Sequence, residues 1–495
     1  MKRASGVLMH ISSLPSSCGI GTMGQAAYEF IDFLARAGQS FWQILPIGPT
    51  SYGDSPYQSF STFAGNPYLI DLDELKEEGW LMAGEYEDCG WGEDITRTDY
   101  GVLYQKRYPV LHRAVKRMME HPPEEYRQFC RSQADWLEDY ALFMTLKVQE
   151  GGRAWYEWDA SWKNRDAEAL RQAEETWQEE VVFWKAVQYL FFRQWNKLRH
   201  YAEEKGIQII GDLPIYVSYD SVDVWSHPEL FQLDGELRPL AVAGCPPDGF
   251  SADGQLWGNP LFDWKGMASD GYDWWIRRIE HQCRVYHVLR IDHFRGFDSY
   301  YSIPFGAPDA SGGHWEEGPG FALFRALNDK IGRQHIIAED LGFLTDSVRK
   351  LLADCGFPGM KVMEFAFDSK ASDNAEYLPH SYPRHCIAYI GTHDNETAKG
   401  WLESLSPEDF RYARDYLRLS SDRQNHYWEM LQALWATAAD ITIVQAQDLL
   451  GLGAEARMNV PSTTGGNWCW RAEPGAFDDV LADRIRYSCE LYCRC

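Results

Sequence analysis

One octapeptide of the 495-residue chain combines residue types that could perform nucleophilic chemistry. Residues 290–297 read Arg-Ile-Asp-His-Phe-Arg-Gly-Phe and follow the apolar pair Val288-Leu289, so the segment begins at the end of an expected buried β-strand. Because side chains two apart on a strand share a face, Arg290 and Asp292 should point the same way. A neighbouring guanidinium lowers the pKa of a carboxylate and keeps it ionised at neutral pH. An ionised, oriented carboxylate at a strand end is what a glycosyl nucleophile requires.

Three further acids follow other apolar runs, and they are Asp212, Glu339 and Asp394. A lone acid at a strand end is usually a helix cap or a loop residue that forms hydrogen bonds. If the apolar runs are the parallel strands of one barrel, all of them end at the same face, and four acids at these ends favour a shared site instead. Asp212 and Arg290 would then hold the acids in place.

Retaining glycosyl transfer needs two carboxyl groups with different roles, a nucleophile and an acid that protonates the leaving oxygen. Asp292 suits the first role. Glu339 suits the second, since an acid in an apolar strand end can have a raised pKa. Asp394, next to His393, could bind sugar hydroxyls and distort the ring towards the transition state.

Eight short apolar runs alternate with helical patterns, which indicates the α/β class and a (β/α)8 TIM barrel with parallel strands. A doubly wound open sheet is the competing architecture, but no Gly-x-Gly-x-x-Gly turn follows a run. Thr345 is expected to cap a helix that ends at Gly356. The runs are residues 6–11, 41–45, 208–210, 288–291, 335–338, 361–363, 386–390 and 441–444.

The spacing of these runs predicts one catalytic barrel domain, residues 1–495, with two elaborations. Residues 75–200 separate the second and third runs and carry strong helical patterns, which predicts a mostly helical insertion. Residues 217–273 are expected to form a loop-rich, substrate-binding insertion. Only about 50 residues follow the eighth run, too few for a C-terminal β-sandwich.

The composition favours an enzyme that acts on neutral substrates. The formal net charge is −26, from 47 Lys and Arg against 73 Asp and Glu, and such a surface repels nucleic acid and anionic membranes. No secretory core or membrane span is recognisable, so we expect a cytoplasmic protein, as a monomer or small homo-oligomer. The 11 cysteines include no Cys-x-x-Cys pair, so reduced thiols are expected rather than a zinc site.

Together, four motifs resemble the α-amylase superfamily and, within it, the amylomaltases of glycoside hydrolase family 77. Further matches lie at residues 45–50, 53–57, 255–260 and 455–459, so the resemblance covers nearly the whole chain. It is weakest in the predicted helical insertion. The four motifs are residues 211–216 (Gly-Asp-Leu-Pro-Ile-Tyr), 290–296 (Arg-Ile-Asp-His-Phe-Arg-Gly), 338–342 (Ala-Glu-Asp-Leu-Gly) and 391–395 (Gly-Thr-His-Asp-Asn).

The resemblance implies Asp292 as nucleophile, Glu339 as general acid and base, and Asp394 as transition-state stabiliser. It also implies that Tyr57 stacks beneath the sugar at the cleaved bond. Without the resemblance, the residue types at these contacts allow a structural role as well, and Trp257 could be a loop anchor. The substrate-binding residues predicted in this way are Tyr57, Asp212, Asp248, Phe250, Trp257, Arg290, His293, His393 and Asn459.

One loop departs from the family pattern. Residues 246–250 carry Gly249 where some relatives have an aromatic side chain, which leaves Phe250 as the aromatic cover of the acceptor side. Acceptor length and any ring-forming side reaction are therefore left open.

The leading hypothesis is a 4-α-glucanotransferase that moves α-1,4-glucan segments between maltooligosaccharides, with retention, through a covalent glycosyl-enzyme. Amylose and glycogen-derived chains would also be substrates. An α-1,4-glucan hydrolase that uses the same carboxylates is the first alternative, and a non-catalytic glucan-binding protein is the second. No cofactor or metal is implied, because the carboxylates supply the acid–base and covalent chemistry and no calcium-binding Asp-x-Asp-x-Asp loop occurs.

Overall fold

The computed structural model describes residues 3–51, 53–247, 253–342, 344–370, 374–463 and 465–495. Its central element is an eight-stranded sheet with the order β10-β11-β12-β1-β2-β3-β6-β9, in which every ladder is parallel. The two end strands approach each other where Ala338 N donates to Pro358 O at 3.0 Å. The sheet is therefore a nearly closed (β/α)8 barrel, as predicted.

All eight predicted apolar runs overlap strands of this sheet. Most of their residues are buried, as expected for parallel strands that are covered on both faces. The strands are β1 (Ala4–Leu8), β2 (Phe41–Gln43), β3 (Gln208–Pro214), β6 (Val288–Asp292), β9 (Ile336–Ala338), β10 (Gly359–Val362), β11 (Cys386–Tyr389) and β12 (Ile441–Gln445).

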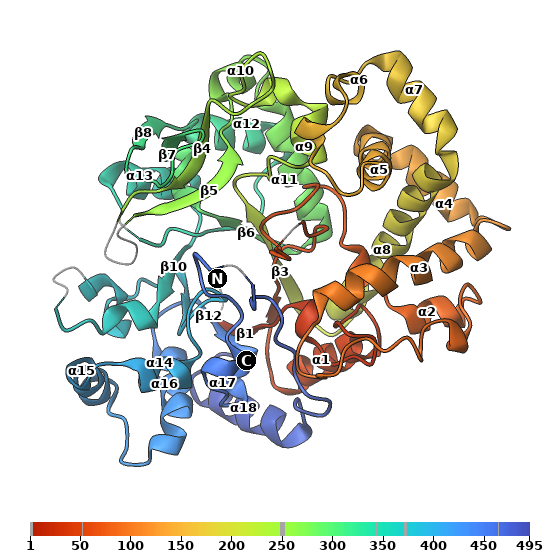
Figure 1. The fold of residues 1–495 in the computed structure, drawn as a ribbon. Helices are drawn as coiled ribbons and strands as arrows, with labels where there is room; N and C mark the ends of the chain where they lie inside the picture. Colours follow the sequence, from red (N-terminus) through yellow and green to blue (C-terminus); the bar gives the residue numbers. More distant parts are fainter. Residues whose placement is uncertain (1–2, 52, 248–252, 343, 371–373, 464) are drawn as a thin grey trace.

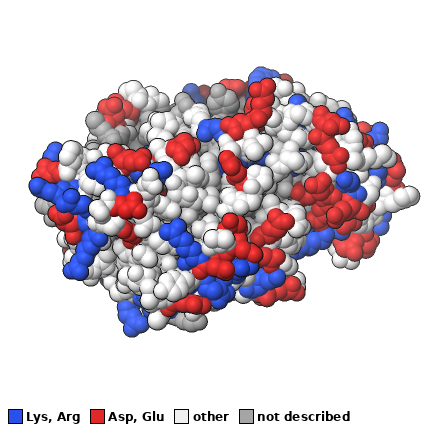
Figure 2. Space-filling model, turned by 90° about the horizontal axis from the view of Figure 1, so that it is seen from below, with Lys and Arg blue, Asp and Glu red and all other residues white. Residues whose placement is uncertain are grey.

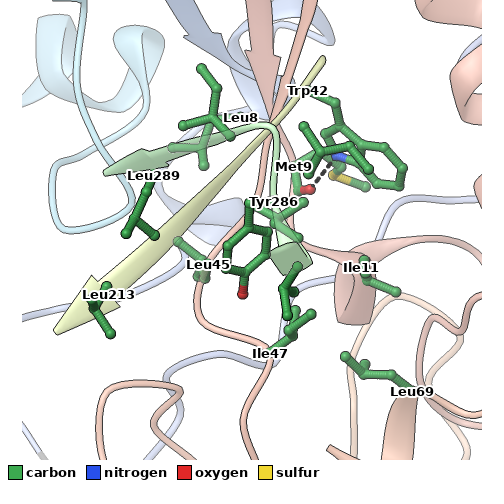
Figure 3. Close-up of a cluster of buried hydrophobic side chains, with 14 of the residues drawn as sticks. Leu8, Met9, Ile11, Trp42, Leu45, Ile47, Leu69, Leu213, Tyr286 and Leu289 are labelled. Carbon is green, nitrogen blue, oxygen red and sulfur yellow. Dashed lines mark hydrogen bonds between the residues drawn. The ribbon is translucent and has the colours of Figure 1, made fainter. Parts of the chain in front are cut away.

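Large apolar side chains fill the space around the first strands of the barrel. In Figure 3, Leu8 and Met9 lie beside Trp42, whose indole Nε1 donates to the Met9 carbonyl at 2.7 Å. Tyr286, which follows α11, lies in the same cluster and is almost fully buried. Burial of each such side chain contributes roughly 1.5–3 kcal/mol, so this packing fixes the strands that carry the polar residues at their ends.

Helices surround the strands and are drawn around the centre of Figure 1. Thr345 caps α13 through a bond to Val348 N, and Gly356 ends it with φ of +69°, so both predicted signals are confirmed. Outside residues 75–200 the helices are α1 (Gln25–Arg36), α9 (Val222–Ser226), α10 (Trp264–Ser269), α11 (Asp273–Val285), α12 (Phe321–Ile331), α13 (Asp346–Cys355), α14 (Ala398–Ser404), α15 (Pro407–Leu417), α16 (His426–Ala436), α17 (Ala446–Leu449) and α18 (Asp479–Leu491).

Between β2 and β3 the described chain is mostly helical, and these helices lie together on the right of Figure 1. The longest of them, α8, also contacts the barrel, since Trp195 Nε1 donates to Val285 O at 3.1 Å. We propose that residues 75–200 are an insertion into a single domain, 1–495. The helices are α2 (Leu72–Glu77), α3 (Tyr100–Met118), α4 (Glu124–Ser132), α5 (Ala134–Gln149), α6 (Ala160–Lys163), α7 (Ala167–Thr176) and α8 (Gln178–Glu204).

A second sheet of four antiparallel strands stands beside the barrel, at the upper left of Figure 1. Its order is β5-β4-β7-β8, from β4 (Ala241–Cys245), β5 (Gln255–Pro260), β7 (Ser299–Pro304) and β8 (His314–Glu317). These strands were not predicted from the sequence. One reason is that β4 consists mainly of small residues, which give no apolar run. Another is that β7 and β8 follow the octapeptide and so lie beyond the boundaries 217–273 that we propose for the second insertion.

Acidic and basic side chains are interspersed over the molecular face in Figure 2, with acidic ones concentrated towards the side where α2 and α3 lie in Figure 1. No helix in the described part of the chain is long and apolar enough to span a membrane.

The segment after α18 closes the base of the barrel through Arg494, which is fully buried. Its guanidinium donates to the main-chain carbonyls of Ala4 (3.1 Å), Trp435 (2.7 Å), Thr437 (3.1 Å) and Ala439 (3.1 Å). The last residues thus tie the start of β1 to the turn before β12.

Replacement of Arg494 by Met should lower the melting temperature markedly, because buried carbonyls without a donor cost roughly 1–3 kcal/mol each. Arg494→Lys should lie between Arg494→Met and the wild type. Thermal unfolding at one fixed heating rate measures this, with the exposed Arg325→Lys on α12 as the control. Equal melting temperatures for all four proteins would contradict the proposed anchoring.

Candidate active site

Asp212, Arg290 and Asp292 form a connected group at the C-terminal ends of β3 and β6. The strand register places Asp212 opposite Arg290 and Pro214 opposite Asp292. Nη1 of Arg290 donates to the two carboxylate oxygens of Asp212 at 2.7 and 2.6 Å and lies 3.0 Å from Oδ1 of Asp292. The Asp212 side chain is 0% exposed and that of Asp292 is 29% exposed. Asp292 is therefore the acid of this group that can reach a bound molecule.

Tyr57 lies directly over this group. Its hydroxyl donates to Oδ2 of Asp212 at 2.7 Å, and its ring stacks on His393 with centroids 5.1 Å apart and an interplanar angle of 15°. Trp468 lies against both rings, 5.9 Å from each. The aromatic rings and the buried ion pair thus hold one another in fixed positions.

Glu339 comes directly after β9 and is bound by main-chain amides. Its Oε2 accepts a hydrogen bond from His293 N at 2.7 Å, and its Oε1 accepts one from Leu341 N at 2.8 Å. His293 itself adopts the left-handed conformation, with φ 52° and ψ 48°. The residue that follows Asp292 therefore also orients Glu339.

Asp394 follows β11 and is the most exposed acid of the site at 47%. Nε2 of His393 lies 3.3 Å from its Oδ2, and Nδ2 of Asn459 donates to its Oδ1 at 2.6 Å. Burial disfavours the carboxylate, but His393 and Asn459 outweigh it and lower the pKa of Asp394 to about 2. Burial likewise disfavours the imidazolium, yet Asp394 outweighs it and raises the pKa of His393.

The pKa of Asp292 differs from the sequence-based expectation. Burial raises it to about 7 and exceeds the lowering by Arg290, while Asp212 and Glu339 raise it further. Burial also raises the pKa of Glu339, against the lowering by Arg290 and two amide donors. A sequence reveals a neighbouring guanidinium but neither how deeply the carboxyl group is buried nor which other acids lie near it, which is why the expected net lowering was wrong.

Two further predicted sugar contacts lie around the same acids. Trp257 packs edge-on against His293 with ring centroids 4.9 Å apart, and its Nε1 donates to Gln255 Oε1 at 3.0 Å. His293 Nε2 is buried without a hydrogen-bond partner among the described residues, and burial lowers the pKa of His293 to about 4. The imidazole is therefore neutral at neutral pH, and its Nε2 is enclosed beside Trp257. Asp248 and Phe250 lie outside the described residues.

The family model described as 4-alpha-glucanotransferase matches residues 9–476. The chain belongs to this family. A 4-alpha-glucanotransferase of Clostridium butyricum is 46% identical over 98% of this chain and 100% of its own, and one of Thermus thermophilus is 45% identical over 99% of each.

Solved structures agree with this assignment. An amylomaltase from Streptococcus agalactiae in complex with acarbose has a TM-score of 0.97 and 45% identity, with 100% of both chains covered. An amylomaltase from Corynebacterium glutamicum is 20% identical, with a TM-score of 0.77 over 99% of this chain and 75% of its own, and shows the shared fold.

Two residues at the 4-alpha-glucanotransferase site were not predicted from the sequence. Trp468 reaches Tyr57 and His393 from a Gly-rich stretch that gave no signal beyond its aromatic content. Arg457 lies in a segment that matches the family, residues 455–459, but no role was predicted for it. Its Nη2 donates to the Asp394 carbonyl at 2.7 Å. Among the described residues, no group of three or more His, Cys, Asp or Glu side chains is arranged to hold a metal.

The backbone at His293 can be tested independently of activity. His293→Val should lower the melting temperature, because a left-handed conformation costs roughly 1–2 kcal/mol for a non-glycine residue and more for a β-branched one. His293→Asn should lower it less, since Asn tolerates this region. The control is His335→Val at an exposed position without positive φ. An equal loss for the Val and Asn variants would contradict a strained backbone there.

Proposed function

We propose that this protein transfers α-1,4-glucan segments between maltooligosaccharides, through a covalent glycosyl-enzyme and with retention of configuration. The observation that carries the proposal is the set of three reachable acids, Asp292, Glu339 and Asp394, around one buried guanidinium in a chain of the 4-alpha-glucanotransferase family. Relatives with this name match over nearly the full length. The acarbose bound to the Streptococcus agalactiae amylomaltase further supports an α-glucan as the substrate.

In the first step, a carboxylate oxygen of Asp292 attacks the anomeric carbon of the donor. The bond from that carbon to the glycosidic oxygen breaks, and Glu339 donates its proton to the departing oxygen. The products are a glycosyl ester on Asp292 and a shortened glucan with a free 4-hydroxyl. The raised pKa of Glu339 favours the protonated form that this step needs.

In the second step, the 4-hydroxyl of an acceptor glucan attacks the same anomeric carbon. Glu339, now a carboxylate, takes the hydroxyl proton, and the bond to Asp292 breaks. Two inversions give net retention, and both carboxyl groups return to their starting protonation states. No cofactor takes part in this scheme.

The exposure of the other predicted residues separates those that hold the site in place from those that can contact a sugar. We assign to Asp212 and Arg290 the role of holding Asp292 and Tyr57, because both side chains are enclosed. Asp394 faces the substrate, as its exposed carboxylate can bind sugar hydroxyls in the transition state. Tyr57, Trp257, His293, His393 and Asn459 are proposed to contact sugars, and Asp248 and Phe250 remain predictions from the sequence.

With maltotriose as the sole substrate, we expect glucose together with a ladder of longer oligomers, because a glucan completes the reaction in place of water. Chromatographic separation of the products over time measures this. Accumulation of only maltose and glucose would show a hydrolase instead.

A matched variant tests the nucleophile in the same assay. Asp292→Asn should reduce product formation by several orders of magnitude, whereas Asp354→Asn on the surface of α13 should not change it. Glucose release by Asp292→Asn at the wild-type rate would remove Asp292 from the role of nucleophile.

The pH dependence should show the ionisation of Asp292. Because the nucleophile must be a carboxylate, kcat/KM should fall as the pH drops through about 7, the value to which burial raises the pKa of Asp292. In Asp212→Asn the neighbouring negative charge is lost, so the acidic limb should move to lower pH. In the Asp354→Asn control the limb should stay in place. A limb that moves to higher pH in Asp212→Asn would contradict this electrostatic account.

A further inference from the structure

Arg457 joins two segments that approach the site from different parts of the chain. One is the acid loop, residues 392–396 after β11, and the other is the strap, residues 457–459 after α17. The guanidinium donates through Nη2 to the Asp394 carbonyl at 2.7 Å and through Nε to the Asn459 carbonyl at 2.8 Å. Its Nη1 lies 3.4 Å from Oε2 of Glu396. One planar group thus binds the acid loop twice and the strap once.

Further bonds align the strap with the acid loop. Asn459 N donates to the His393 carbonyl at 3.1 Å, and the Asn459 side chain donates to Asp394 Oδ1 at 2.6 Å. On the far side, Gln445 Nε2 donates to the Glu396 carbonyl at 3.0 Å. The main chain and the carboxylate of Asp394 are therefore both held by residues 457–459.

We propose that Arg457 is a positioning residue for Asp394, with Glu396 orienting the guanidinium. This inference rests on the function proposed above, in which Asp394 binds sugar hydroxyls in the transition state. Arg457 does not need to contact the substrate, because it acts through the Asp394 carbonyl. Its side chain is 24% exposed and that of Glu396 is 17% exposed, so both charges are partly shielded from water.

The chemistry of the site explains why an arginine is needed. A guanidinium presents five N–H donors in a fixed plane and can bind three acceptors at once, whereas an ammonium is a compact charge on a flexible stem. A displacement of about 1 Å in a group that contacts the transition state can cost roughly a hundredfold in rate. Arg457→Lys keeps the charge but not the three-way geometry, so it isolates the positioning effect.

The test is a double-mutant cycle measured by acarbose binding, with calorimetry on the wild type, Arg457→Lys, Asp394→Asn and the double variant. If Arg457 acts through Asp394, Arg457→Lys should weaken binding roughly ten- to a hundredfold in the wild-type background and very little in the Asp394→Asn background. On maltotriose, Arg457→Lys should lower kcat and leave KM nearly unchanged. Glu396→Gln should give a smaller loss in the same direction.

The matched control is Arg414→Lys, at an exposed arginine whose Nη2 also pairs with a carboxylate, 2.6 Å from Asp415 Oδ1. It should change neither acarbose binding nor kcat. Equal weakening by Arg457→Lys in both backgrounds, or no weakening at all, would overturn the inference. A wild-type protein that neither binds acarbose nor disproportionates maltotriose would instead overturn the proposed function.

Discussion

The site depends on one buried positive charge among several carboxylates. Arg290, a residue of β6, is buried and pairs with the fully buried side chain of Asp212 on β3 and with the partly exposed Asp292. Arg290 is shared between two acids, and at Asp292 the effect of burial on the pKa outweighs the attraction of the guanidinium. The result is a carboxyl group that Arg290 holds in place and whose pKa burial raises to about 7. Tyr57, bonded to Asp212, takes its position from the same pair.

The barrel could be predicted because each of its strands gives a recognisable pattern in the local sequence. Parallel strands covered on both faces appear as short apolar runs, and the acids at their C-terminal ends mark the functional face. The four-stranded sheet escaped prediction, since β4 is built of small residues and pairs with β7 from beyond the octapeptide. The net pKa of Asp292 also escaped, because it depends on three acids that lie far apart in sequence. The local sequence pattern indicates which acids lie at strand ends, but only the fold shows how these acids change one another's pKa values.

Glu339 and Asp394 are held by different means. Glu339 is bound by the main-chain amides of His293 and Leu341. Asp394 is bound by side chains, from His393 beside it and Asn459 on the strap. Burial raises the pKa of Glu339, while its two amide donors lower it. The side chains that contact Asp394, by contrast, all lower its pKa and favour the charged carboxylate. In the reaction proposed above, Glu339 exchanges a proton and Asp394 stays charged, which agrees with this difference.

The order of strands in the barrel has a consequence for biosynthesis. β1 lies between β2 and β12 in the barrel. One edge of β1 can therefore pair only after β12, which is about 430 residues later in the sequence, has been synthesised. The strap and Arg494 follow later still, and they complete the surroundings of Asp394 and the base of β1. A chain still on the ribosome therefore contains Asp292 long before it contains the strap that surrounds Asp394. The glucan transfer proposed above can therefore begin only after the strap has been made.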